Sequence, residues 1–225
     1  MQRYYLDAQQ KTGIVYCAVA LNDFDNIPMH ARRETPEYDI VWNLLPRAVQ
    51  TARALGAAVL QVPAFGASEI KSEADCRMSA RVLQYLCDNA GAYDICVATE
   101  NLMNKSEFER LYQAVDRPNF ALYFDSQNYQ LFRGYSETAI LDDLYPYMCN
   151  QLHVKDGRGA MSGALLGTGD AGFGETIRWL KSHQYRGYLL LENYYDQLPL
   201  RRTAENPYDL LREDIRILKA AISAV

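Results

Sequence analysis

Short apolar runs alternate along the chain with longer segments in which apolar residues recur at helical spacing. The short runs are rich in β-branched and aromatic residues, and several are apolar at nearly every position. That pattern is typical of strands buried on both faces of a parallel sheet. We predict six strands, at residues 13–20, 57–63, 94–100, 120–125, 150–155 and 187–192.

The segments between these strands predict helices. Over residues 36–55 apolar positions recur every three or four residues, Thr35 before a proline favours a helix start, and Gly56 favours a helix end. Ser106 and Glu109 predict a capping box at the start of a short helix that ends near residue 115. Further helices are expected at residues 2–10, 72–89, 136–147, 173–184 and 207–224.

Strands that alternate with helices predict βαβ units and therefore a parallel sheet. We predict an α/β fold, a (β/α) TIM-type barrel that forms a single domain over residues 1–225. A complete barrel has eight strands and takes about 250 residues. Since only six strands are found, we expect a barrel that lacks its first one or two strands. A doubly wound open sheet is the alternative architecture.

Composition excludes several classes of protein. The net charge of −5 disfavours a nucleic-acid partner held by a basic surface. No apolar stretch approaches the ~20 residues of a membrane span, and the first residues lack the apolar core of a signal peptide. The five cysteines are widely spaced and form no CxxC pair. We therefore expect reduced thiols and a cytoplasmic protein.

Four successive predicted strands end on residues that can bind a metal. Glu100, Asp125, His153 and Glu192 stand at or near these strand ends, and the carboxyl ends of barrel strands open on one face. Each residue alone has an ordinary explanation as a turn residue, a helix cap or a core histidine. Together they predict one divalent metal ion. Carboxylates with one imidazole suit Mn²⁺ first, with Mg²⁺, Co²⁺ or Zn²⁺ as alternatives.

Two further segments are considered as parts of a binding site. The glycine-rich residues 167–174 lack the Lys-Ser/Thr pair of a phosphate-binding P-loop, so we interpret them as a structural loop that leads into a helix. Phe65 follows a predicted strand, where its ring would pack either on a substrate or on the barrel rim.

Three stretches resemble the sugar-phosphate isomerase/epimerase superfamily, the xylose isomerase-like barrels. They are VATENL, FDSQN followed by QLHVKDGRG, and LGTGDAGFGETIRWLKSHQYRGYLLLEN. The resemblance extends from about residue 13 to the end of the chain. It implies that Glu100, Asp125, His153 and Glu192 hold the metal, and that the two glutamates serve as acid and base. It implies an isomerase or epimerase that acts on a keto-sugar or sugar phosphate through an enediolate.

The same resemblance implies which residues contact the substrate: Lys155, Asp156 and Arg158, to which we add Asn128 and Phe65 as expected contacts. The epimerase branch carries a histidine where Asn128 stands. Two other functions therefore stay open. One is a dehydratase of the inosose or dehydroshikimate type on the same metal site. The other is a non-catalytic barrel remnant that binds a sugar or a partner. An incomplete barrel would also expose apolar edges that a second copy could cover in a homo-oligomer.

Overall fold

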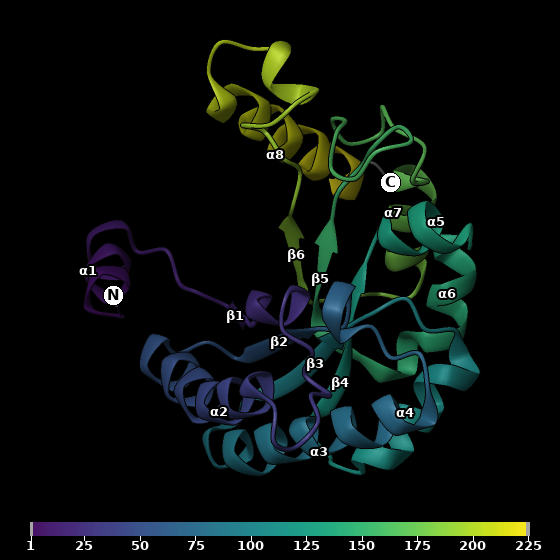
Figure 1. Ribbon diagram of the computed structural model, residues 1–225. Coiled ribbons are helices and arrows are strands. Elements are labelled where there is room, and N and C mark those ends of the chain that lie inside the picture. Colours follow the sequence, from purple (N-terminus) through teal and green to yellow (C-terminus); the bar gives the residue numbers. More distant parts are fainter. Residues whose placement is uncertain (1, 224–225) are drawn as a thin grey trace. The chain divides into compact units, whose positions relative to one another are not determined.

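The computed structural model describes residues 2–223, in which six strands are joined by helices (Figure 1). The strands are β1 (Ala18–Ala20), β2 (Val59–Pro63), β3 (Cys96–Glu100), β4 (Phe120–Asp125), β5 (Met148–Val154) and β6 (Tyr188–Leu191). The α-helices are α1 (Gln2–Thr12), α2 (Pro36–Leu55), α3 (Glu73–Ala90), α4 (Lys105–Val115), α5 (Asn128–Arg133), α6 (Glu137–Leu144), α7 (Phe173–Ser182) and α8 (Pro207–Ser223).

The six strands form one sheet whose order follows the chain. The pairs β1–β2, β2–β3, β3–β4 and β5–β6 are all parallel. This arrangement confirms the predicted α/β class and the six predicted strands. No helix among the described residues is long and apolar enough to cross a membrane.

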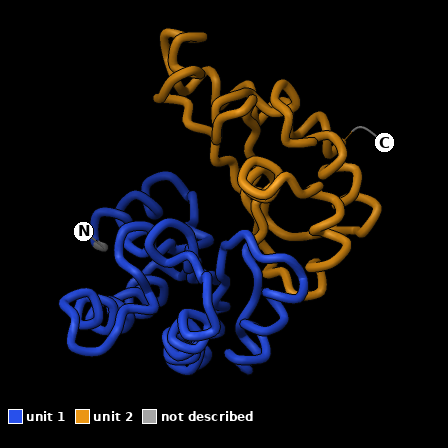
Figure 2. Tube along the Cα trace, turned by 45° about the vertical axis from the view of Figure 1, so that its right-hand side comes forward, with its two compact units in different colours: residues 1–123 blue, residues 124–225 orange. Residues whose placement is uncertain are grey.

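The chain divides into two compact units, residues 1–123 and residues 124–225 (Figure 2). The boundary falls within β4, so unit 1 ends inside this strand and unit 2 begins with its last residues. The single domain expected over residues 1–225 stays a prediction.

Unit 1 is built on parallel strands covered by helices. Helix α2 packs against β1 and β2, α3 packs against β3, and α4 packs against α3 (Figure 1). Every residue of β2 is buried, as its nearly continuous apolar sequence predicts, and the burial includes the polar Gln61. Strand β1 is shorter than the predicted run 13–20, and the Ile14 and Val15 side chains before it are 68% and 64% exposed. Apolar sequence alone does not make a strand where no neighbouring strand pairs with it.

Helix α2 begins and ends where the sequence predicts. The Thr35 hydroxyl accepts a hydrogen bond from the backbone amide of Tyr38 at 3.3 Å, and Gly56 ends the helix with a φ of 69°. A glycine adopts this left-handed conformation without steric cost.

The start of α4 corrects one prediction. The helix is capped by Asn104 and Glu107 instead of Ser106 and Glu109. The sequence contains two overlapping patterns of the capping-box type. The Asn104 pattern forms the cap, and the Ser106 hydroxyl donates a hydrogen bond to the Asn104 side chain at 2.8 Å.

Unit 2 contains the parallel pair β5–β6 and helices α5 to α8. His153 in β5 pairs with Leu190 in β6, and α7 packs against both α6 and α8. Strand β6 is only partly buried, and its first side chain, Tyr188, is 54% exposed. The short helix α5 was not predicted. It starts three residues after Asp125, and this position makes it part of the candidate site.

Candidate metal centre

Three of the four predicted ligands converge in unit 2. The Nδ1 atom of His153 lies 3.3 Å from Oε2 of Glu192 and 3.8 Å from Oδ2 of Asp125. One ligand atom from each of the three residues lies within 4.8 Å of those from the other two. Asp125 and His153 are buried, whereas 35% of the Glu192 side chain is exposed. The group therefore has a buried side and one ligand that solvent reaches.

The two carboxylate oxygens of Asp125 have separate tasks. Oδ1 accepts hydrogen bonds from the backbone amides of Gln127 and Asn128, both at 2.8 Å, and so shapes the turn that leads into α5. Oδ2 is the atom that faces His153. The interpretation of Asp125 as a turn residue and its interpretation as a ligand are thus both compatible with the structure.

The Lys155 side chain lies among these carboxylates. Its Nζ is 2.9 Å from Oδ2 of Asp125 and 2.7 Å from Oε2 of Glu192, and 3% of its side chain is exposed. Alternation along an extended segment puts residues 153 and 155 on the same face. The sequence resemblance implied a substrate contact for Lys155, and the structure places its ammonium group between two predicted metal ligands.

Ser126 ties the ends of β4 and β5 together. Its hydroxyl accepts a hydrogen bond from the backbone amide of Lys155 at 3.0 Å and donates one to the carbonyl of the same residue at 3.2 Å. Its own backbone amide donates to the carbonyl of His153 at 3.1 Å. The backbone on both sides of the ligand group is therefore fixed by hydrogen bonds.

The fourth predicted ligand, Glu100, lies in unit 1 at the end of β3. Its side chain is buried and accepts a hydrogen bond from the Gln61 side chain of β2. β3 pairs with the beginning of β4, with Thr99 opposite Leu122, and β4 then continues to Asp125. That Glu100 binds the same ion as the three residues of unit 2 stays a prediction.

Asp156 organises the loop that follows β5. It is 1% exposed, and its carboxylate accepts hydrogen bonds from the backbone amides of Gly157, Gly167, Gly169 and Ala171, at 2.8 to 3.2 Å. Four backbone donors on one buried carboxylate hold the glycine-rich loop in a single conformation. This agrees with the interpretation of residues 167–174 as a structural loop. A substrate contact for Asp156 stays a prediction.

A second buried acid connects α8 to the same region. Asp214 accepts hydrogen bonds from the Leu166 amide at 2.8 Å, the Asn193 side chain at 2.7 Å and the Tyr195 hydroxyl at 2.9 Å. Burial raises the pKa of the Asp214 carboxyl, and these hydrogen bonds lower it in part. Asn193 follows Glu192 directly, so its hydrogen bond to Asp214 helps to fix the segment that carries Glu192.

The other expected substrate contacts lie as follows. Arg158 is exposed and donates to the carbonyl of Thr168. Asn128 is buried at the start of α5, and Phe65 is half-buried in unit 1, where it precedes a short 3₁₀ turn. The roles of these three residues as substrate contacts stay predictions.

Sequence reasoning missed Glu137, a buried acid in unit 2. One carboxylate oxygen accepts a hydrogen bond from the Gln130 backbone amide at 2.9 Å, and the other finds no hydrogen-bond partner within residues 2–223. Burial raises the pKa of Glu137 well above its ordinary value, and the negative charge of Asp125 raises it further. In the sequence Ser-Glu-Thr reads as the exposed first turn of a helix, so no local signal marks this residue.

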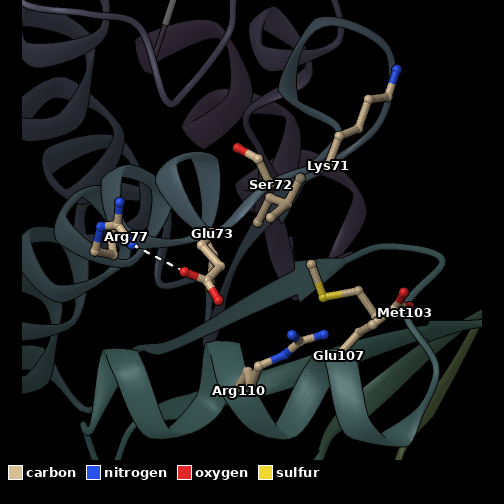
Figure 3. Close-up of a pocket in the computed structure, with 9 residues that line it drawn as sticks. Lys71, Ser72, Glu73, Arg77, Met103, Glu107 and Arg110 are labelled. Carbon is tan, nitrogen blue, oxygen red and sulfur yellow. Dashed lines mark ion pairs between the residues drawn. The ribbon is translucent and has the colours of Figure 1, made fainter.

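A pocket of about 420 Å³ lies in unit 1, where α3 and α4 begin (Figure 3). Side chains of the two helices face one another across it, and Arg77 pairs with Glu73 at 3.6 Å. Its charged lining residues are three basic and two acidic: Lys71, Arg77, Arg110, Glu73 and Glu107.

The residues of unit 2 fit a hard divalent ion. Their donors are two carboxylate oxygens and one imidazole nitrogen, within the span that one ion can bridge. Ions such as Mn²⁺, Mg²⁺ and Co²⁺ favour oxygen-rich sites with an imidazole. Asp125, His153 and Glu192 could therefore hold one divalent metal ion.

Comparisons with known proteins bear on the fold and the family of the chain. The model of the xylose isomerase-like TIM barrel family matches residues 5–221. A 2-epi-5-epi-valiolone 7-phosphate 2-epimerase from Actinoplanes sp. is 29% identical over 187 residues, which cover 82% of this chain and 67% of the relative.

Solved structures share the fold at lower identity. A xylose isomerase domain protein from Planctomyces limnophilus matches with a TM-score of 0.74 and 17% identity, covering 98% of this chain and 82% of the other. A D-allulose 3-epimerase from Methylomonas sp., in complex with D-allulose, matches with a TM-score of 0.73 and 20% identity, covering 96% and 80%.

Proposed function

Because the chain belongs to the family of xylose isomerase-like TIM barrels, we propose that it is a metal-dependent isomerase or epimerase of a keto-sugar or sugar phosphate. The observation that carries the proposal is the convergence of Asp125 Oδ2, His153 Nδ1 and Glu192 Oε2. Glu100 is proposed as the fourth ligand, and Mn²⁺ as the ion. The name of the Actinoplanes relative, an epimerase of a phosphorylated compound, supports the class of substrate.

The proposed chemistry is proton transfer at a carbon next to a carbonyl group. A bound divalent ion would supply a Lewis acid that stabilises negative charge on the carbonyl oxygen. Glu192 is the exposed member of the group, so its carboxylate can reach a substrate carbon and take the proton. Glu100, the buried acid of unit 1, would return a proton to the resulting enediolate. Asp125 and His153 would orient the site and exchange no proton with the substrate.

Asn128 weakens the assignment to the ketose 3-epimerases themselves, so a dehydratase is kept as the second enzymatic candidate. Asn128 stands where the epimerase branch has a histidine. Its side chain is buried, and its backbone amide donates a hydrogen bond to Asp125. An amide side chain cannot exchange protons as an imidazole does. A dehydratase of the inosose or dehydroshikimate type needs the same first proton transfer and then expels water, so it would use the same ligands.

Two measurements test the proposal. Elemental analysis of the purified chain should find about one divalent ion per chain, which His153→Ala should lose. The wild type with Mn²⁺ is then incubated in D₂O with a panel of ketoses, ketose phosphates and inososes, and ¹H NMR follows exchange of the carbon-bound proton. Exchange with an epimeric or isomeric product supports the proposal, and exchange with loss of water supports the dehydratase. Bound metal without exchange on any compound would favour a non-catalytic remnant.

A further inference from the structure

The position of Lys155 has a consequence for metal binding. Its ammonium group contacts Oδ2 of Asp125 and Oε2 of Glu192, the same two oxygens that face the His153 imidazole. We infer that Lys155 competes with the metal ion for these oxygens. The side chain weakens ion binding, and it keeps the two carboxylates together when no ion is bound. The inference rests on the metal site of the proposed function.

The competition follows first from how Asp125 is held. Its Oδ1 already accepts two hydrogen bonds from backbone amides, at 2.8 Å each. Those donors, Gln127 and Asn128, lie where α5 begins and cannot be given up without unfolding the start of this helix. Oδ2 is thus the oxygen that Asp125 offers to a cation, and Lys155 Nζ lies 2.9 Å from it.

It follows also from how Lys155 is fixed. Hydrogen bonds with the Ser126 hydroxyl hold both its backbone amide and its carbonyl. Only 3% of its side chain is exposed. The ammonium group therefore cannot move freely into solvent when an ion binds, and it stays near the two oxygens.

Electrostatics gives the direction of the effect. An ion bound to Asp125 Oδ2 and Glu192 Oε2 would lie within a few ångströms of the ammonium charge, and like charges at that distance in a buried site repel strongly. Without an ion, the ammonium balances carboxylates whose burial without a partner is costly. Lys155 thus lowers the affinity for metal and stabilises the metal-free protein.

The test uses the full chain as wild type, Lys155→Met, Lys155→Gln and Lys219→Met. Lys219 is an exposed residue of α8 and serves as a matched control for loss of one positive charge. Each protein is stripped with a chelator. Binding of Mn²⁺ is then measured by titration calorimetry, and the midpoint of thermal unfolding is measured with and without saturating Mn²⁺.

We expect Lys155→Met to bind Mn²⁺ at least about tenfold more tightly than wild type. We expect its metal-free form to unfold about 5 °C or more below the wild type, and Mn²⁺ to restore the difference. Lys219→Met should match the wild type in both measurements. Should Lys155→Met fail to fold, Lys155→Gln, which keeps a hydrogen-bond donor and removes the charge, carries the comparison.

The outcomes separate this inference from the proposed function. Equal or weaker Mn²⁺ binding by both Lys155 variants, beside a wild type that binds the ion, overturns the inference alone. Absence of binding in all four proteins overturns the metal-dependent function and the inference together. Binding by the Lys155 variants and not by the wild type supports the competition and overturns metal dependence of the native chain.

Discussion

The carboxylate of Asp156 accepts a hydrogen bond from the backbone amide of Gly169 at 3.0 Å. A Cβ atom on residue 169 would collide with Asp156 Oδ1 and with the carbonyl oxygen of Gly157. The glycine-rich loop can therefore approach the Asp156 carboxylate this closely because residue 169 has no side chain. Asp156, which holds the loop, follows Lys155 directly in the sequence, so the conformation of the loop bears on the site.

Gly169→Ala should therefore destabilise the protein by about 1–3 kcal/mol, the usual cost of overpacking a buried site. Urea denaturation measures the change. Gly174→Ala is the matched control, since its new methyl group would meet only the end of the Arg178 side chain, at 3.3 Å. A Gly169→Ala protein as stable as this control would contradict the close packing of the loop.

Asp156→Asn should weaken the same loop from the other side. The amide cannot accept the four backbone hydrogen bonds as a carboxylate does, and hydrogen bonds to a charged group contribute about 1.5–3 kcal/mol each. We expect a loss of at least about 3 kcal/mol in the free energy of unfolding. Asp170→Asn, which affects a single exposed bond from Gly159, should cost about 1 kcal/mol or less. Equal losses in the two variants would count against the role of Asp156.

Local sequence signals located most elements, and the ligand roles that they indicated stay predictions. The helix over residues 36–55 and the strand over 120–125 match the structure to the residue, because a cap, a glycine or a polar residue ends each apolar pattern. Structural features that depend on residues distant in the sequence could not be predicted from such local signals. Residues 13–17 lie outside β1 although they were predicted as part of this strand, and the burial of Glu137 depends on packing that no short pattern encodes.

The role of Lys155 shows the same limit at the site. The family resemblance implied that it lines the pocket. Its contact with Asp125 and Glu192 depends on how three strand ends meet, and this cannot be read from spacing. The choice of Asn104 over Ser106 as the cap of α4 is likewise invisible in the sequence, since both patterns satisfy the same rule.

Glu137→Gln should change how stability depends on pH. The folded-state pKa of Glu137 lies above its ordinary value of 4.5, so between these two values the folded protein keeps a proton that the unfolded chain releases. Stability contributed by this group is therefore present below the ordinary pKa and falls as the pH rises toward the folded-state pKa. The glutamine variant lacks this loss. Its stability relative to wild type should rise with pH.

Urea denaturation from about pH 4.5 to about pH 8 measures that difference. Glu175→Gln is the control, because Glu175 is an exposed residue of α7 that pairs with Arg178 on the surface of the same helix. Parallel pH profiles for wild type and Glu137→Gln would show that the buried carboxyl does not titrate as its burial requires.

Glu192→Gln should abolish turnover and leave the fold intact. The amide keeps the shape of the side chain and cannot accept a proton, and loss of a general base costs about 10²- to 10⁴-fold in rate. The rate of proton exchange in D₂O on the compound found in the screen measures this loss, and circular dichroism checks the fold. Glu205→Gln, at an exposed acid, should keep the wild-type rate. Full activity in Glu192→Gln would remove this residue from the mechanism.

The uneven exposure of the three ligands in unit 2 also sets how the centre exchanges with solution. The Asp125 side chain is 1% exposed and that of His153 is 10% exposed, against 35% for Glu192. If the site binds metal as proposed, a dissolved ion or a chelator would therefore meet Glu192 first on entry and last on departure. The two buried residues, together with Lys155, would set how tightly an ion is held, and the partly exposed glutamate would set how quickly it comes and goes.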